Sequence, residues 1–157
     1  MKKIFLICIL VTTSINIGYA KWGPLNMEQL KKYSSVIVEA ELITEKSSEA
    51  VNSGKVQVVQ FKPIKIIKGE IEMLFLVHGS QQDICKAQYY FKNAKGDMYL
   101  LFLNLVKGTD IYRVVNGPFG ALPISEEKKV KWFGGDKKSY WKREAKLLSE
   151  VYKDLTR

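Results

Sequence analysis

Two side chains in this chain could together form a nucleophilic site: His78, its single histidine, and Cys85, one of its two cysteines. An imidazole that takes a proton from a neighbouring thiol is the arrangement of a thiol enzyme or a small hydrolase. The segment between them would have to fold back until the two side chains are within hydrogen-bonding reach. A histidine that packs or faces water at a strand end is the alternative. Because a structural zinc needs more nitrogen and sulfur ligands than these two residues supply, they predict no metal site.

Two pairs of carboxylates have the spacing of residues on one face of a strand. Glu39 and Glu41 form one pair, and Glu70 and Glu72 form the other. Paired carboxylates carry out glycosidic chemistry in hydrolases, but glutamates that alternate with apolar residues are typical of the solvated face of a sheet. The chain also contains no glycine-rich phosphate loop, dinucleotide fingerprint or serine elbow. We therefore expect solvated glutamates and a non-enzymatic protein without a cofactor.

The start of the chain has the layout of a secretory signal peptide. Lys2 and Lys3 form a basic start, and Ile4–Val11 is an unbroken apolar run. Small residues then precede a cleavage site between Ala20 and Lys21. The apolar run is much shorter than the roughly 20 residues of a membrane-spanning helix, although an uncleaved N-terminal membrane anchor is the alternative. The segment predicts export to the periplasm or the extracellular space.

Cleavage would leave a chain of 137 residues, a usual length for one domain. It removes two lysines, so that 23 basic residues face 16 acidic ones and the net charge is +7. It also removes Cys8, which leaves Cys85 without a partner for an internal disulfide. Cys85 is then a buried apolar side chain, a free thiol or the link of a disulfide-bonded dimer, and the buried form is favoured.

Apolar periodicity predicts the first elements of this domain. Asn26 is a good N-cap for a short helix at Met27–Tyr33. Residues 36–43 alternate as a strand does, with apolar side chains on one face and glutamates on the other. Residues 45–54 are polar and turn-prone, which predicts an exposed loop.

The second strand is predicted to be irregular. Its alternation over Val56–Ile67 changes face between Val58 and Val59, and Pro63 follows. A slip of one residue exchanges the two faces of a strand, so a bulge or a sharp bend is expected there. The remaining expected elements are a strand at 71–77, an irregular segment at 79–97, strands at 99–106 and 111–115, a short segment at 121–124, and a helix at 140–155 capped by Ser139.

The expected fold is mainly β: a five-stranded OB-like barrel with a short N-terminal helix and a longer C-terminal amphipathic helix. Closure of the barrel would remove exposed strand edges. Short motifs recur in a recognisable order at Val36–Glu41, Ile66–Gly69, Cys85, Gly96–Leu103 and Tyr112–Gly117. The order of these motifs resembles that of bacterial exported proteins with netrin-like OB barrels, which are similar to tissue inhibitors of metalloproteinases. The resemblance covers Tyr33–Ile124.

The resemblance implies the barrel but not the family's inhibitory mechanism. Tissue inhibitors of metalloproteinases chelate the zinc of the protease through a cysteine at their mature N-terminus. Here the expected mature chain begins Lys21-Trp22-Gly23. The family's disulfides have no counterpart either, because Cys85 has no second cysteine to pair with.

A basic and aromatic cluster within 79–97 is the candidate ligand surface. OB barrels bind oligonucleotides and oligosaccharides on one sheet face and its loops. Export argues against a nucleic acid and favours a protein or a glycan. Aromatic side chains that plug one end of the barrel are the alternative. The candidate residues are Lys86, Tyr89, Tyr90, Phe91, Lys92 and Lys95.

The expected C-terminal helix is basic at its start and carries an apolar stripe at Trp141, Ala145, Leu148, Tyr152 and Leu155. A basic amphipathic helix with aromatic residues can lie on an anionic membrane surface. In the alternative, the stripe packs across the barrel and the lysines face water. The candidate membrane or partner residues are Lys138, Trp141, Lys142, Arg143 and Lys146.

The chain is thus expected to have three parts: a signal peptide at 1–20, the OB-like barrel with its leading helix at 21–125, and a basic linker with a helix that packs on the barrel at 126–157. The leading expectation for function is an exported, non-enzymatic module that binds a protein or a glycan. A small secreted hydrolase or thiol enzyme that uses His78 and Cys85 is one alternative. A peripheral membrane-surface protein is the other.

Overall fold

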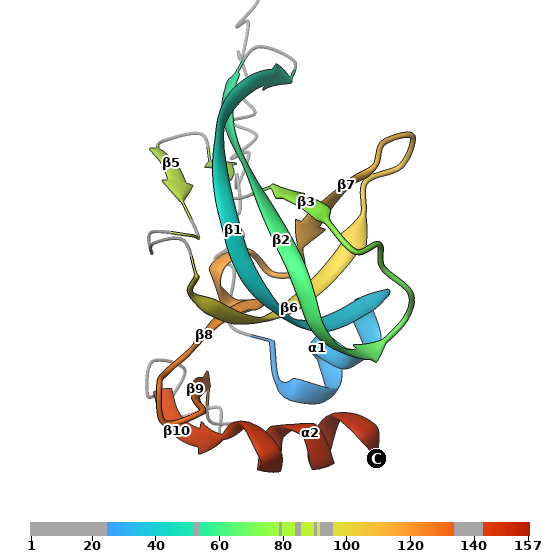
Figure 1. The fold of residues 1–157 in the computed structure, drawn as a ribbon, viewed down its shortest axis with the longest axis vertical. Coiled ribbons are helices and arrows are strands. Elements are labelled where there is room, and N and C mark those ends of the chain that lie inside the picture. The colour runs from blue at the N-terminus through green and yellow to red at the C-terminus, as the bar shows by residue number, and fades with distance from the viewer. Residues whose placement is uncertain are drawn as a thin grey trace, which may run out of the picture.

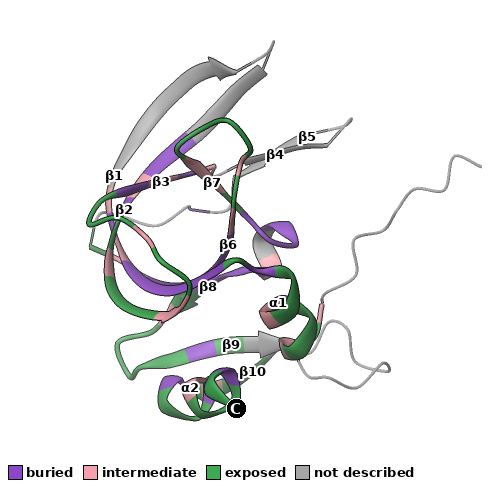
Figure 2. Cartoon of the chain, turned by 90° about the vertical axis from the view of Figure 1, so that its right-hand side faces the viewer, coloured by how far each residue is buried: buried purple, intermediate pink, exposed green. Residues whose placement is uncertain are grey.

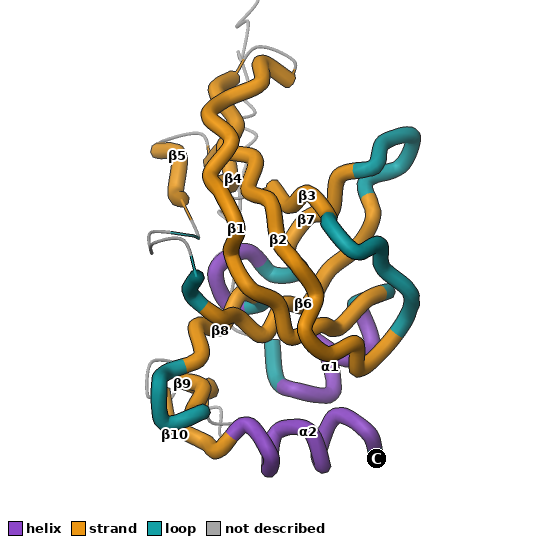
Figure 3. The backbone as a smooth tube through the Cα atoms, in the orientation of Figure 1, coloured by secondary structure: helices purple, strands orange, loops and turns teal. Residues whose placement is uncertain are grey.

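Five strands close into a barrel, which confirms the expected OB-like fold. The computed structural model describes residues 25–51, 54–78, 80–83, 86–89, 91, 96–133 and 143–157. Figure 1 shows the barrel with the two helices of the described chain below it, and Figure 3 traces the same backbone by secondary structure. The elements are α1 (Met27–Tyr33), β1 (Val36–Val51), β2 (Gly54–Lys68), β3 (Phe75–His78), β4 (Ser80–Asp83), β5 (Lys86–Tyr89), β6 (Met98–Leu105), β7 (Ile111–Val114), the 3-10 turn η1 (Gly117–Phe119), β8 (Ala121–Ile124), β9 (Lys129–Phe133), β10 (Arg143–Leu147) and α2 (Leu148–Thr156).

The ring of strands follows the order β1, β2, β3, β7, β6 and returns to β1. Neighbouring strands are antiparallel apart from β3 and β7, which run parallel. β1 closes the ring because its first half pairs with β2 along one edge and with β6 along the other. Val38, for example, lies opposite Ile66 on β2 and Leu101 on β6. In this half of β1 neither edge is open to another chain.

A bend in the second strand is confirmed, but it lies at Pro63 and not between Val58 and Val59, where the pairing with β1 and β3 keeps its register. The pairing of β1 with β2 changes register between Glu39 and Ala40, where Pro63 lies opposite Ala40. It changes again between Leu42 and Thr44. Proline cannot donate to the ladder, and each bulge increases the local twist. The two long strands can therefore curve around the barrel.

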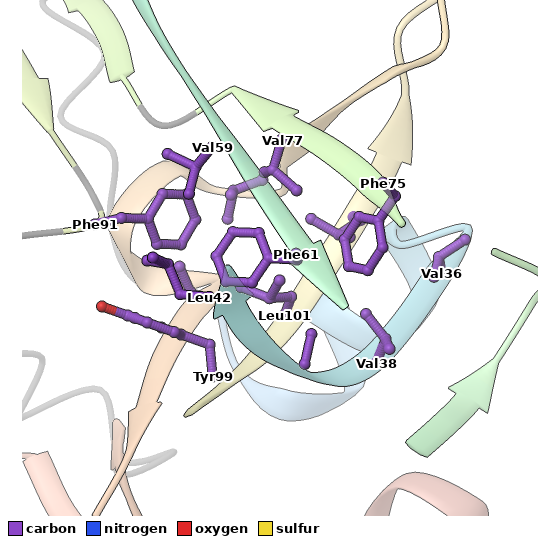
Figure 4. Packing of buried hydrophobic residues seen from close by; sticks show 14 residues of the cluster. Val36, Val38, Leu42, Val59, Phe61, Phe75, Val77, Phe91, Tyr99 and Leu101 are labelled. Atoms are coloured by element: carbon purple, nitrogen blue, oxygen red, sulfur yellow. The ribbon is translucent and has the colours of Figure 1, made fainter. Parts of the chain in front are cut away.

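Side chains from alternate strand positions fill the barrel interior (Figure 4). The ring of Phe61 lies at the centre of an aromatic group, with its centroid 5.9 Å from that of Phe75, 4.9 Å from Phe91 and 5.8 Å from Tyr99. Such pairs add about 0.5–1.5 kcal/mol each to the stabilisation from burial alone. Around them lie the buried aliphatic residues Val36, Val38, Ala40, Leu42, Val59, Val77, Leu101, Leu103 and Val114.

A second apolar cluster lies outside the barrel, between its strands and the two helices. Ile37 of β1 and Leu100 and Phe102 of β6 belong to it, alternating with the residues that face inward. β6 is thus buried on both faces, as its almost wholly apolar sequence predicts (Figure 2). The cluster consists of Leu30, Ile37, Leu100, Phe102, Val115, Leu122, Val130, Leu148, Val151 and Leu155.

Helix α1 begins after Asn26, as predicted, where Asn26 and Gln29 form a capping box. At the other end of the helix, the Lys68 Nζ donates to the carbonyl oxygens of Lys31, at 2.7 Å, and Ser34, at 2.5 Å. The last carbonyls of a helix have no partner within the helix. The lysine supplies one and thereby ties α1 to the end of β2.

Two predicted boundaries in the first half of the chain are wrong. The exposed loop expected at 45–54 is largely strand, because β1 and β2 continue pairing to Val51 opposite Gly54. The strand expected at 71–77 begins only at Phe75, where pairing with Phe61 starts. In both places the pairing of the backbone with a neighbouring strand, rather than local composition, decides where the strand ends.

The predicted C-terminal helix is also wrong in its first part. Arg143–Leu147 forms β10, which pairs antiparallel with Lys129–Phe133, and the helix begins only at Leu148. A backbone committed to this ladder cannot also form helical hydrogen bonds. Ser139, the expected N-cap, lies outside the described residues. Neither α1 nor α2 has the length and apolarity that crossing a bilayer requires.

Two glycines separate the effect of backbone conformation from that of close packing. Gly69 and Gly108 have nearly the same positive φ, +76° and +79°. A Cβ at Gly69 would collide with the Ser35 carbonyl oxygen, whereas a Cβ at Gly108 would meet nothing within 4 Å. We expect Gly108→Ala to cost about 1 kcal/mol of unfolding free energy, the price of the left-handed conformation. Gly69→Ala should cost at least about 2 kcal/mol, because the Ser35 backbone must also move.

Urea denaturation of the two variants checks this expectation. Equal losses of unfolding free energy would show that Gly69 is not closely packed against the link between α1 and β1.

Candidate functional site

His78 lies at the end of β3, half-buried, opposite Val58 on β2 and Arg113 on β7. Burial lowers the pKa of its imidazole below the ordinary value, so the ring is neutral at pH 7. Cys85 lies outside the described residues, and the predicted pair therefore stays a prediction. Among the side chains that the structure describes, no three of His, Cys, Asp and Glu gather in a way that could hold a metal ion.

Phe91 is not available as part of a ligand surface. Its side chain is 1% exposed and packs inside the barrel, with its ring 4.9 Å from Phe61 and 5.2 Å from Tyr99 between centroids (Figure 4). The expectation that it binds a ligand is wrong, and the alternative that it plugs the barrel is correct for this residue. The burial of a large aromatic side chain outweighs the polar character of the segment around it.

Of the other candidate ligand-binding residues, the structure describes the backbone of two. Lys86 and Tyr89 lie at the two ends of β5, which pairs with β4. Tyr90, Lys92 and Lys95 lie outside the described residues, as do Ala20 and Lys21 at the predicted cleavage site.

The basic residues assigned to the C-terminal helix do not form one helical face. Arg143 and Lys146 lie on β10, so their assignment to a helix is wrong. Lys138, Trp141 and Lys142 lie outside the described residues. Of the predicted apolar stripe, Leu148 and Leu155 are buried against the outer cluster, Tyr152 packs at its margin, and Ala145 is exposed on β10.

Glu39 is not solvated, which corrects the expectation for this residue, and Glu41 is half-buried. It is 7% exposed on the outer face of β1, where its carboxylate accepts a hydrogen bond from the Tyr152 hydroxyl of α2. Lys65, opposite Glu39 on β2, places its ammonium 3.9 Å from the centroid of the Tyr152 ring. Together these three side chains hold the last helix to the barrel. Glu70 and Glu72 are exposed, as expected.

Tyr152→Phe tests this contact between helix and barrel. We expect a loss of about 1–3 kcal/mol of unfolding free energy, because Glu39 stays buried without its donor. Tyr33→Phe removes a hydroxyl from a ring that is 52% exposed, and should change stability by less than about 0.5 kcal/mol.

The same contact predicts a dependence on alkaline pH. Burial and the hydrogen bond to Glu39 raise the pKa of Tyr152 far above its ordinary value. The stabilisation is therefore complete below about pH 10, the pKa of an unfolded tyrosine, and is lost as the pH rises further. The unfolding free energy of the wild type should fall more steeply above about pH 10 than that of Tyr152→Phe. Parallel curves for the two proteins would contradict the contact.

Most exposed large apolar residues of the described chain lie on elements that meet at one end of the barrel. β1 starts at this end and β2 ends at it, with Ile37 opposite Lys68. β6 also ends here, beside the start of β7, with Leu105 opposite Tyr112. β3 also starts here, because it runs parallel to β7. We call this region the apolar end; its exposed residues are Tyr33 at 52%, Ile64 at 51%, Ile66 at 47%, Met73 at 84%, Leu74 at 49% and Leu105 at 51%.

Loops and element ends carry several of these exposed residues. Met73 and Leu74 lie in the loop between β2 and β3, which leaves the ladder after Lys68 and returns to it at Phe75 (Figure 1). Asn104 Nδ2 donates to the Tyr33 carbonyl oxygen at 2.8 Å, which holds the last residue of α1 beside the end of β6. The remaining exposed large apolar residue of the described chain, Leu147, lies on β10.

Charges of both signs surround the apolar end. The exposed basic residues on these elements and their turns include Lys32, Lys62, Lys65, Lys107 and Arg113, and the exposed acidic ones include Glu70, Glu72 and Asp110. Burial raises the pKa of Tyr112, and the negative charge of Glu72 raises it further. An apolar centre with a mixed polar rim is the composition of a protein interface.

The sequence did not indicate this surface. Ile71, Met73, Phe75 and Val77 alternate as the buried face of one strand would, but only Phe75 and Val77 enter the core fully. Ile71 is half-buried against it, and Met73 is the most exposed large apolar residue described. Gly69, directly after β2, is the one local signal in the sequence that the chain leaves the ladder here.

A scan of the chain against protein-family models finds no match, and a search of curated proteins finds none either. The candidate surfaces are therefore judged by their own geometry and charge. The resemblance to tissue inhibitors of metalloproteinases remains a prediction.

Proposed function

We propose that this protein is an exported, non-enzymatic binding module whose partner is a protein, held at the apolar end of the barrel. The observation that carries the proposal is the concentration of exposed apolar side chains at that end, with Met73 exposed by 84%. Exposed apolar side chains that gather in one place, rather than singly, are typical of interaction sites. The export segment, predicted at 1–20, supplies the compartment.

The packing of the barrel favours a partner bound on its outside. Phe61, Phe91 and Tyr99 fill the interior in direct contact with one another. A ligand that entered would have to displace buried aromatic side chains, each of which contributes several kcal/mol to stability. The partner therefore contacts residues that are already exposed.

The chemistry of the apolar end favours a protein over a glycan or a membrane. Its centre is mostly aliphatic and offers few hydrogen bonds, whereas a glycan presents hydroxyl groups that need partners. Glu70 and Glu72 precede Met73 in the same loop, whereas the basic residues of this end lie on other elements, so an anionic membrane surface would meet acidic side chains beside the most exposed residue. The membrane-surface alternative rested on the C-terminal helix, and the buried face of α2 already packs on the barrel.

Paired substitutions at the apolar end test the proposal. The tagged protein, expressed from the full-length gene and purified as the cell processes it, is used to capture partners from envelope and extracellular fractions. We expect a protein partner to be retained by the wild type. Met73→Asp/Leu74→Asp should weaken retention at least roughly tenfold, because interface residues of this kind contribute about 1 kcal/mol or more each.

Leu147→Asp provides the matched control. Leu147 is 44% exposed, close to the 49% of Leu74, but it lies on β10. Retention by this variant, immobilised at a density low enough that copies of the chain do not contact each other, should equal that of the wild type. Equal retention by Met73→Asp/Leu74→Asp, or capture of a polysaccharide in place of a protein, would contradict the proposal.

A further inference from the structure

The strand β10 has one edge paired and the other open. It stands last in the order of the sheet, with β9 on one side and none of the described strands on the other. The ring strand β1, at the opposite end of that order, is closed by β6. An open edge presents backbone N–H and C=O groups that can pair with another strand.

The ladder with β9 determines which groups point to the open edge. The Leu148 N–H donates to the Lys128 carbonyl oxygen at 2.8 Å, directly beyond the last paired residues of the two strands. Because bonded and non-bonded pairs alternate in an antiparallel ladder, Lys146 and Glu144 share this orientation and bond to β9. Arg143 and Ala145 therefore direct their N–H and C=O groups to the open edge. Leu147 directs its N–H there as well, while its C=O, as that of the N-cap of α2, accepts the first hydrogen bond of the helix.

We propose that β10 pairs antiparallel with β10 of a second copy of this chain, with the two-fold axis at Ala145. In this register Ala145 lies opposite Ala145 of the second copy, and each Arg143 lies opposite a Leu147. Each Glu144 lies opposite a Lys146, which gives two pairs of opposite charge related by the axis. In this register the residues with backbone groups directed to the open edge lie opposite one another, at the positions of hydrogen-bonded pairs in the new ladder.

Charge selects this register over its neighbours. A shift of two residues in one direction places Glu144 opposite Glu144, and a shift in the other direction places Lys146 opposite Lys146. Like charges directly opposite each other destabilise a strand pair. The exposed side chains of Glu144 and Ala145 leave the edge accessible, and Lys146 is half-buried.

The dimer leaves the apolar end free. β10 and the loop between β2 and β3 lie on opposite sides of the molecule in Figure 1. The inference therefore does not rest on the proposed function, and either can fail without the other. A ladder of five residues is short, and two basic chains repel each other, so the dimer is weak and depends on concentration.

Charge reversal on β10 tests the pairing. The processed protein is studied by sedimentation velocity over a concentration series, with Glu144→Lys, Lys146→Glu and the double variant E144K/K146E. Each single reversal turns two attractive pairs into two repulsive ones, so dimerisation should weaken roughly tenfold or more. The double variant restores opposite charges in both pairs and should return to the affinity of the wild type.

Lys131→Glu is the control for net charge. It makes the same change of charge as Lys146→Glu, but Lys131 lies on β9, opposite Ala145 within the hairpin. Its dimerisation should stay within about twofold of the wild type, as expected of an exposed charge outside the pairing. Far-UV circular dichroism and thermal unfolding verify that all four variants fold.

A wild type that stays monomeric at millimolar concentration overturns the proposal. A dimer that is insensitive to the single reversals, or that the double variant does not restore, overturns it as well, because the contact then lies elsewhere.

Discussion

In its first half, β1 is paired along both edges, and the arrangement of the barrel and the helices follows from this pairing. Because β1 pairs with β2 and β6 at once, its alternate side chains are divided between two compartments. Val36, Val38, Ala40 and Leu42 enter the barrel, whereas Ile37 joins the outer cluster and Glu39 meets the last helix. One strand thereby holds the closed barrel and the helical layer together, and the bulges near Pro63 allow the curvature this requires.

Periodic segments could be predicted from the sequence because a single physical pattern governs each of them. The alternation of 36–43 and the almost wholly apolar run of β6 correspond to strands buried on one or both faces. The capping residues Asn26 and Gln29 fix the start of α1. Where two patterns compete, prediction fails: the spacing of Ala145, Leu148 and Tyr152 suits a helix, yet pairing with β9 holds Arg143–Leu147 as a strand.

The candidate site was less predictable because exposure depends on contacts between distant parts of the chain. Phe91 stands in a polar segment, and only the space between Phe61 and Tyr99 shows that it belongs to the core. Met73 stands in an apolar alternation, and only the end of the β2–β3 ladder shows that it lies at the surface. Glu39 is buried because Tyr152, at the other end of the chain, reaches it. Local sequence carries no information on any of these three contacts.

The barrel is filled by its own side chains, which leaves only its outer surface to the proposed partner. The unfolding free energy of Phe91→Ala, measured by urea denaturation beside that of Leu74→Ala, tests this most directly. The structure predicts a loss of about 3–5 kcal/mol for the buried Phe91, and a change within about 0.5 kcal/mol for Leu74, which is 49% exposed. A loss for Phe91→Ala no larger than that of Leu74→Ala would contradict the claim and would return Phe91 to the ligand surface.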